Sequence, residues 1–287
     1  MHITDIAKRV LNTIRLIPSM YKYGGVTHIS VSTIDYHGSL FSAHDVALVT
    51  GGSSGIGFEI ARRLIEEGAT VIITGRSTQK LDEARLKINS DRLHTLEWDI
   101  SDVRLIPAKM EEAEHLVHKP ITILINNAGT YSKTHFPHTT SEDWDTVYLT
   151  NLKGLYFLTQ HFVNDIIKLP PHRGIRKIIN IASQGGMVAA NNAYRMTKWD
   201  IRGFTKHLGI AYASEGIIAN AIAPGIILTD MQPQLKQQGD NIYSRENPTK
   251  RVGLPVEIAE LAIFLASSAS NYIVGETICC DGGYNIK

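Results

Sequence analysis

The stretch VALVTGGSSGIGFEIARRLIEEG, Val46 to Gly68, decides the fold class of this chain. A β-prone apolar run comes first, a turn with Gly51, Gly55 and Gly57 follows, and apolar residues then recur at helical spacing. Glycine lets the main chain approach a ligand closely, and the first amides of a helix attract an anion. This arrangement is typical of the pyrophosphate site in a doubly wound α/β fold. A glycine-rich turn also serves purely steric purposes, so it needs support from the rest of the chain.

The chain after Asp45 alternates strand-like apolar runs with helical patterns. Such alternation indicates a parallel sheet covered by helices on both faces. The sequence of this region shows neither a repeat nor a Pro- or Gly-rich linker, so we predict one α/β domain over residues 45–287. The predicted strands are Val46–Thr50, Thr70–Thr74, Leu93–Trp98, Ile121–Asn126, Lys177–Ala182, Ile217–Ile222 and Thr277–Cys280.

The composition is ordinary for a globular protein and excludes several functional classes. The chain has 287 residues, of which 43% are hydrophobic and 20% charged, and its formal net charge is +1. A nearly neutral chain lacks the basic field that binds nucleic acid, so we expect a small-molecule partner. No apolar run reaches the roughly 20 residues that span a bilayer. The only two cysteines, Cys279 and Cys280, are adjacent, which predicts reduced thiols and a cytoplasmic location.

Residues 1–44 differ from the rest and are predicted to form an N-terminal extension. Between Ile3 and Ile17 apolar residues recur at helical spacing, with basic residues among them. A basic amphipathic helix can lie on a membrane surface or serve in targeting. Apolar stripes more often pack against the same protein or a neighbouring subunit, and we favour that interpretation. A hairpin is predicted around residues 35–38.

The end of the second predicted strand, VIITGRS, bears on the choice of dinucleotide. Many folds that bind NAD place an acidic residue here to hold the ribose hydroxyls of adenosine. This chain has Gly75 at that point and Arg76 next. Without a carboxylate a 2'-phosphate is not repelled, and a guanidinium can bind it with two hydrogen bonds. We therefore favour NADP over NAD, although a solvated surface arginine would give the same pattern.

Further motifs follow the glycine-rich turn in a fixed order. Thr50 to Gly57, TGGSSGIG, resembles the TGxxxGxG cofactor loop of the short-chain dehydrogenase/reductase family. The motifs WDIS, NNAG, NLKG, NIASQGG, YRMTK and APGIILTDM, and the tail SNYIVGETICCDGG, also resemble that family. The resemblance covers about residues 45 to 284, and the joint order of the motifs is very specific. It implies a single Rossmann-type domain and an NADP(H)-dependent oxidoreductase that acts on a carbonyl or secondary alcohol.

The same resemblance implies which residues act in the two parts of the site. The implied catalytic residues are Asn151, Ser183, Tyr194 and Lys198. The implied cofactor-binding residues are Gly51, Ser53, Ser54, Gly55, Ile56, Gly57, Arg76, Ser77, Asp99, Ile100, Asn127, Ala128, Gly129, Tyr194, Lys198, Pro224, Gly225, Ile227 and Thr229. NADP is the expected cofactor and NAD stays an alternative. No metal is expected, because the tyrosine supplies the acid and the twelve histidines show no metal-binding spacing.

Tyr194 and Lys198 lie four positions apart and so share one face of a predicted helix. A free tyrosine has a pKa of about 10. A nearby ammonium stabilises phenolate, so we expect Lys198 to lower the pKa of Tyr194. The resemblance implies that Tyr194 protonates the substrate oxygen, that Ser183 donates a hydrogen bond to it, and that Asn151 holds a water linking Lys198 to solvent. Many YxxxK pairs have no catalytic role, and only the accompanying motifs decide against that alternative.

The sequence determines the substrate least. Ser183 and Tyr194 are eleven positions apart, closer than is usual in the family, so the loop between them must be trimmed. Polar side chains in this loop, such as Gln184, suit a hydroxylated ketone, whereas Met187 suits an apolar channel. The polar segment after Thr229 is predicted to form a variable lid.

Two other functions stay open. Reduction of a 3-oxoacyl chain on an acidic carrier protein would use the basic segment HRGIRK, His172 to Lys177, as a docking surface, although a solvated charge cluster explains it as well. A non-catalytic sensor or scaffold would keep the nucleotide pocket and lack turnover. The tail resembles segments that pack between subunits, so a homodimer or homotetramer is expected.

Overall fold

A computed structural model describes residues 40–168, 176–229 and 242–286 of the chain. The predicted amphipathic helix, the predicted hairpin and the first half of the predicted lid, residues 230–241, lie outside these ranges. Within them, no helix is both long and apolar enough to cross a membrane.

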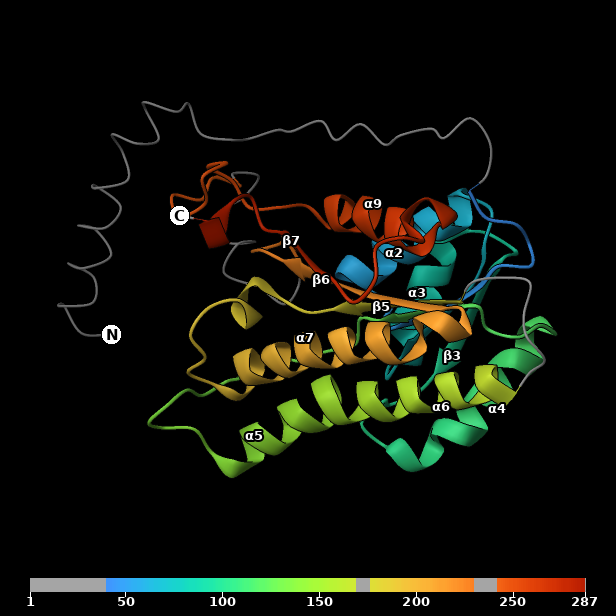
Figure 1. The fold of residues 1–287 in the computed structure, drawn as a ribbon, viewed down its shortest axis with the longest axis horizontal. Helices are drawn as coiled ribbons and strands as arrows, with labels where there is room; N and C mark the ends of the chain where they lie inside the picture. Colours follow the sequence, from blue (N-terminus) through green and yellow to red (C-terminus); the bar gives the residue numbers. More distant parts are fainter. Residues whose placement is uncertain (1–39, 169–175, 230–241, 287) are drawn as a thin grey trace.

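Seven parallel strands form one sheet in the order β3-β2-β1-β4-β5-β6-β7 (Figure 1). The order reverses between β1 and β4, which is the switch point where doubly wound folds bind their ligands. All seven predicted strands are present, with ends within two residues of the predicted ones. The predicted Rossmann-type fold is therefore confirmed. The strands are β1 (Val46–Thr50), β2 (Thr70–Gly75), β3 (Leu93–Glu97), β4 (Ile123–Asn126), β5 (Arg176–Ile181), β6 (Ile217–Pro224) and β7 (Thr277–Cys280).

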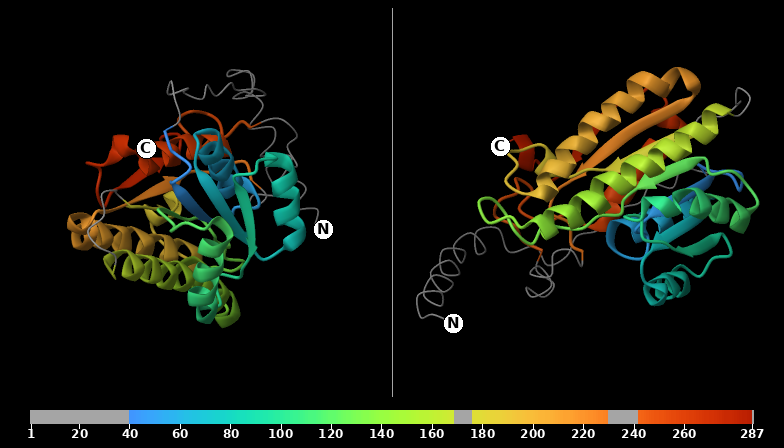
Figure 2. Two further views of the ribbon diagram at one scale, coloured as in Figure 1. Left: turned by 90° about the vertical axis from the view of Figure 1, so that its right-hand side faces the viewer. Right: turned by 90° about the horizontal axis from the view of Figure 1, so that it is seen from below.

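Helices cover both faces of the sheet (Figures 1 and 2). In β1, Ala47 and Val49 belong to one core cluster, and Val46 and Leu48 to another, because successive strand side chains point to opposite faces. The helices on the first face are α2 (Gly55–Glu66), α3 (Thr78–Ile88) and α9 (Pro255–Ala266). Those on the second are α4 (Ile106–Val117), α6 (Leu155–Lys168) and α7 (Ala193–Tyr212), with α5 (Ser141–Tyr148) leading into α6.

The start of α7 is fixed by its N-terminal cap. The Asn192 side chain accepts a hydrogen bond of 2.9 Å from the Arg195 amide. Asparagine is among the strongest caps because its side-chain oxygen satisfies an otherwise unpaired amide. The cap therefore places Tyr194 in the first turn of α7, at the carboxyl edge of the sheet.

A buried polar network joins the sheet to the helices of the second face. The Asn126 amide on β4 donates to Thr159 on α6 at 2.9 Å and to Asn180 on β5 at 2.8 Å. The Asn180 amide in turn donates to Thr205 on α7 at 2.9 Å. A buried network of this kind favours one arrangement of the elements that it joins, because breaking it leaves polar atoms without partners. The network thus helps to position α7 relative to β4 and β5.

Candidate active site

The turn between β1 and α2 has a backbone shape that requires glycine. Gly51 and Gly55 have φ values of 65° and 58°, in the left-handed region that glycine adopts without strain. A Cβ atom at Gly57 would lie 2.5 Å from the Gly51 carbonyl oxygen, so no larger residue fits there. The turn thereby places the N-terminus of α2 at the carboxyl end of β1, a position that suits an anion site.

The loops that follow β1 and β4 are bonded to each other. The Thr50 hydroxyl oxygen accepts hydrogen bonds of 3.0 Å from the amides of Asn127 and Ala128. The Asn127 side chain donates to the carbonyls of Thr50 at 2.9 Å and Gly51 at 3.1 Å. These bonds bring three of the predicted cofactor-binding residues, Gly51, Asn127 and Ala128, together at the switch point.

Other predicted cofactor-binding residues surround the same turn. A Cβ on Gly55 would meet the Thr229 methyl group at 3.2 Å, so the loop after β6 lies against the glycine-rich turn. Ser53 lies beside Gly75 at the end of β2. Ser77, two residues further on, accepts a hydrogen bond from the Lys80 amide and caps α3. The ends of β1, β2, β4 and β6 thus form one continuous surface.

Two predicted contacts to the adenosine end of a cofactor lie on the loops after β2 and β3. Arg76 is exposed and forms no hydrogen bond or ion pair with another described residue. Asp99 is half-buried, and its Oδ1 accepts hydrogen bonds from the amide and the hydroxyl of Ser101. Ile100 is buried. The guanidinium of Arg76 is therefore available to a ligand without breaking an internal bond.

Ser183, Tyr194 and Lys198 meet at the carboxyl end of β5. The Lys198 side chain is only 4% exposed, and its Nζ donates to the Ile181 carbonyl at 2.7 Å. The same Nζ lies 5.6 Å from the centre of the Tyr194 ring. Ser183 follows β5, and its hydroxyl accepts a 3.0 Å hydrogen bond from the Gly185 amide. A Cβ on Gly129 would lie 3.8 Å from the Lys198 Nζ, so the loop after β4 borders this cluster.

The pKa of Tyr194 is shifted in the direction opposite to the expected one. Burial raises the pKa of Tyr194, and a hydrogen bond with Ser183 only partly opposes that effect. Burial also lowers the pKa of Lys198 to about 8. The prediction that the ammonium lowers the pKa of Tyr194 is therefore wrong for the protein alone. The sequence shows the spacing of the pair but not the depth at which the phenol is buried, and burial has the larger effect.

Asn151 lies in a π-helical turn, Leu149–Gly154, between α5 and α6. Its Oδ1 accepts from the Thr130 amide at 2.7 Å, and its Nδ2 donates to the Thr130 carbonyl at 2.9 Å. Nδ2 also lies 3.4 Å from the Thr197 hydroxyl of α7. The side chain of Asn151 thus holds the loop after β4 in place, and its bonds do not reach Lys198.

Two residues that were not predicted from the sequence contact Tyr194. The Tyr194 amide donates to the Ser132 hydroxyl at 2.9 Å, and the Tyr131 ring lies 4.8 Å from the Tyr194 ring, centre to centre. Both lie within three residues after the NNAG motif, in the loop after β4. Both residues could have been predicted from their position at the carboxyl edge of the sheet, because side chains converge there in a parallel fold.

Glycine explains how so short a loop connects Ser183 to Tyr194. A Cβ on Gly186 would lie 2.6 Å from the main-chain carbonyl of Lys198, so this loop packs directly on α7. Two side chains of α7 hold it there. The Trp199 Nε1 donates to the Val188 carbonyl at 2.8 Å, and the Arg202 Nη1 to the Gly186 carbonyl at 2.6 Å.

The basic segment offered as a docking surface is largely not on the surface where it is described. Arg176 and Lys177 open β5 and are 8% and 3% exposed. The Lys177 Nζ donates to the Ser270 hydroxyl at 3.1 Å. The prediction of a basic docking surface, and equally of a solvated cluster, is wrong for these two residues because they belong to a central strand. Residues 172–175 lie outside the described ranges.

Comparison with known proteins agrees with this geometry. A family model described as Enoyl-(Acyl carrier protein) reductase matches residues 51–285. The chain is 35% identical over 243 residues to 3-oxoacyl-(acyl-carrier-protein) reductase of Aquifex aeolicus (strain VF5). This match covers 83% of this chain and 96% of that protein. It is 31% identical over 258 residues to gluconate 5-dehydrogenase of Gluconobacter oxydans (strain 621H), and that match covers 88% of this chain and 99% of that protein.

A solved structure shares the whole fold. The gluconate 5-dehydrogenase from Burkholderia cenocepacia J2315, in complex with NADP and tartrate, has a TM-score of 0.78 and 30% identity. The match covers 87% of this chain and 98% of that one. The family matches, the parallel sheet and the ordered motifs show that this chain belongs to the short-chain dehydrogenase/reductase family of oxidoreductases, which act on alcohol or carbonyl groups.

Proposed function

We propose that the protein transfers hydride between NADP(H) and a carbonyl or secondary alcohol, with Tyr194 as the general acid and base. The observation that carries this proposal is the cluster at the end of β5. The half-buried Tyr194 ring lies 5.6 Å from the Lys198 ammonium, and hydrogen bonding with Ser183 lowers the pKa of its phenol against the effect of burial. This cluster contains a proton donor, a hydrogen-bond donor for a developing oxyanion and a neighbouring cation.

The protonation states suit reduction at neutral pH. Because burial raises the pKa of Tyr194, its phenol is protonated and can donate to the substrate oxygen. Ser183 donates a hydrogen bond to the same oxygen as negative charge develops there. Lys198, with a pKa of about 8, is mostly charged at neutral pH and stabilises the phenolate left after proton transfer. Oxidation of an alcohol uses the same steps in reverse.

The residues around the glycine-rich turn fit a dinucleotide. Gly57 packs against the Asn127 side chain and the Gly51 carbonyl, so the tight turn needs glycine at the start of α2, where helix amides suit a pyrophosphate. Arg76 has no partner among the described residues, which supports the proposal that it binds a 2'-phosphate. Asp99 and Ile100 would contact the adenine, Lys198 the nicotinamide ribose, and residues 224–229 the nicotinamide. When bound, NADPH supplies the hydride. NAD stays the alternative cofactor.

Substitution of the phenol tests the proposal. With a panel of ketones and NADPH, we expect Tyr194→Phe to lower kcat/KM by roughly 10²- to 10⁴-fold, the usual contribution of a positioned acid. The neighbouring Tyr131→Phe serves as the matched control and should keep most of the activity. NADPH fluorescence titration should show similar binding in all three proteins. Turnover that survives in Tyr194→Phe refutes the assignment of the acid, and cofactor binding without turnover on any substrate favours a sensor.

Reduction of 3-oxoacyl thioesters is the second candidate, because several relatives are 3-oxoacyl-(acyl-carrier-protein) reductases. Sugar-acid substrates have equal support from the gluconate 5-dehydrogenases. The burial of Arg176 and Lys177 removes two of the residues that would have received an acidic carrier protein. Comparing acetoacetyl thioesters with 5-ketogluconate at equal concentrations separates the two classes.

A homodimer or homotetramer is supported by apolar side chains on the outer face of α5 to α7. Leu149, Tyr156 and Phe157 are 38–43% exposed and line a cavity of about 510 Å³ with Leu152 and Phe204. Exposed apolar patches commonly mark contacts between proteins. Analytical ultracentrifugation of the wild type and Tyr156→Lys tests this assembly, and the variant is expected to shift toward the monomer. The cytoplasmic location stays a prediction, which imaging of a tagged chain tests.

A further inference from the structure

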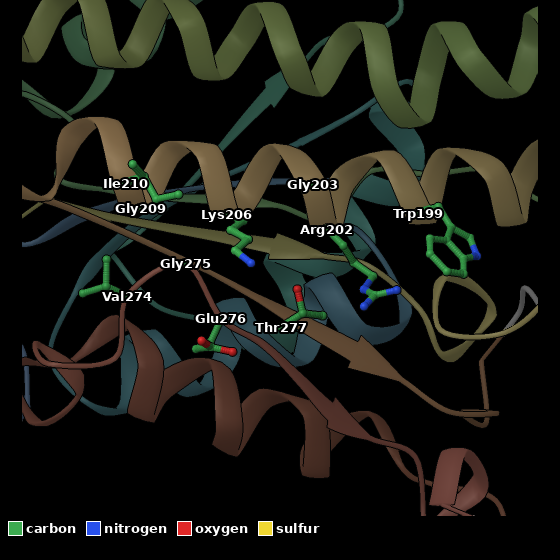
Figure 3. A pocket seen from close by; sticks show the side chains of 10 residues that line it. All are labelled: Trp199, Arg202, Gly203, Lys206, Gly209, Ile210, Val274, Gly275, Glu276 and Thr277. Atoms are coloured by element: carbon green, nitrogen blue, oxygen red, sulfur yellow. The ribbon is translucent and has the colours of Figure 1, made fainter.

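A second cavity, of about 600 Å³, lies between α7 and the segment that leads into β7 (Figure 3). Its lining includes Trp199, Arg202, Lys206 and Ile210 from α7, and Val274 and Thr277 from the facing segment. None of the predicted catalytic or cofactor-binding residues lines it. Its volume falls within the roughly 300–1,000 Å³ of typical small-molecule sites.

Two cations of α7 face this cavity without a counterion. Arg202 and Lys206 are four residues apart, a spacing at which like charges repel on a helix. Neither forms an ion pair with a carboxylate of the described residues, although Glu276 also lines the cavity. Figure 3 shows both side chains pointing from α7 toward Thr277. The cavity therefore holds two positive charges against one negative charge.

The guanidinium of Arg202 keeps unused hydrogen-bond donors. Its Nη1 donates to the Gly186 carbonyl at 2.6 Å, and its centre lies 4.9 Å from the Trp199 ring. Its Nε is buried and has no hydrogen-bond partner in the described structure. Its Nη2 has no hydrogen-bond partner among the described residues and is not buried, so it can donate to a carboxylate or a phosphate in the cavity.

We propose that this cavity binds a small organic anion, a molecule that carries a carboxylate or phosphate group on an apolar body. The anionic group would pair with Arg202 and Lys206 and accept a hydrogen bond from the Thr277 hydroxyl. The apolar body would contact Trp199, Ile210 and Val274. The site is separate from the proposed cofactor surface, and it stands whether or not the proposed reaction is correct.

Titration with small anions tests this proposal directly. The probes are benzoate and phenyl phosphate, and benzamide and phenol are uncharged controls of similar shape. Calorimetry on the full chain measures the binding of each. We expect saturable binding of at least one anion, and weakening by about tenfold or more in Lys206→Gln and in Arg202→Gln, as the loss of a charged hydrogen bond implies. Arg76→Gln, on the proposed nucleotide surface, should bind the probe like the wild type. Probe binding can also be followed by tryptophan fluorescence. The part of the fluorescence change that is present in the wild type and absent in Trp199→Phe comes from Trp199, which lines the cavity.

The outcomes separate the possibilities. Binding of phenyl phosphate alone assigns a phosphate ligand, and binding of benzoate alone assigns a carboxylate. The proposal fails if no anion binds, if the uncharged controls bind as well as the anions, or if Lys206→Gln binds like the wild type. It also fails if the variants change only the sedimentation mass, which would make the cavity a contact between subunits. Lys206 is exposed, so its variant stays informative if Arg202→Gln does not fold.

Discussion

Burial sets the charge states of the two central residues of the site. It keeps the Tyr194 phenol protonated and brings the pKa of Lys198 down to about 8. A cation with a lowered pKa is charged below that value and neutral above it. The state with a protonated phenol beside a charged lysine is therefore populated at neutral pH and is lost as pH rises.

The pH dependence of reduction follows from Lys198. We expect kcat/KM for ketone reduction to fall as pH rises through about 8, because the ammonium that stabilises the phenolate is lost. Lys198→Arg keeps its charge over the whole range, so in that variant the fall should move to higher pH, whatever the residual rate. Rate profiles between pH 6 and 10, a window of about two pH units on either side of that pKa, measure this shift. Coinciding profiles for wild type and variant would show that another group titrates.

Cofactor choice is tested at Arg76. We expect Arg76→Ala to reduce the preference for NADPH over NADH by roughly tenfold or more, the effect of losing one charged contact to a phosphate. The exposed Arg92, at the opposite end of the neighbouring strand, is the control, and Arg92→Ala should leave the ratio of the two kcat/KM values unchanged. An unchanged ratio in Arg76→Ala removes this residue from the account of cofactor choice.

At the scale of the elements, the short loop before α7 depends on a glycine contact. Gly186→Ala places a Cβ 2.6 Å from the Lys198 main chain, so we expect loss of roughly 1–3 kcal/mol of stability and a displaced Ser183. Gly203→Ala, on the exposed side of the same helix, meets nothing within 4 Å and should stabilise by about 0.5–1 kcal/mol. Urea unfolding and ketone reduction measure both effects. Equal stability of the two variants would mean that the loop shifts without cost.

The same elements show what a sequence can and cannot predict. Strands such as Val46–Thr50 were predictable because a central parallel strand is apolar throughout, and the motifs marked the ends that carry the site. Lys177 was misplaced because a basic residue normally marks the surface, whereas here Ser270 gives it a buried partner. The bonds of Asn151 to Thr130 were not predictable either, because they depend on a π-helical turn and on contacts 21 residues apart.

At the scale of the whole molecule, Lys177 makes stability depend on pH. Burial lowers the pKa of Lys177 to about 8, below its value in the unfolded chain, so the unfolded state binds the proton more tightly between these values. The free energy of unfolding should therefore rise as pH increases from about 8 toward 10, in the range where the folded lysine is already neutral.

Replacing this lysine isolates its effect. Lys177→Met should stabilise the protein at pH 7 by roughly 1–3 kcal/mol and weaken the rise with pH, because the charge no longer has to be buried. Lys87→Met, at an exposed position on α3, should change stability by less than about 0.5 kcal/mol. Chemical unfolding at pH 7 and at pH 9.5, about 1.5 units above that pKa, measures the free energy of unfolding of all three proteins. If Lys177→Met destabilises the protein at both pH values, the hydrogen bond between Lys177 and Ser270 outweighs the cost of burying the lysine.

The parallel sheet also divides the molecule into a reactive end and an inert one. Every strand delivers its carboxyl end to the proposed chemistry, so the turns that precede the strands lie at the far end. One of them, around the exposed His118 between α4 and β4, is both accessible and remote from Tyr194. An affinity tag or a fluorophore inserted there would leave the mouth of the site clear, and the protein could be immobilised on a sensor in a defined orientation.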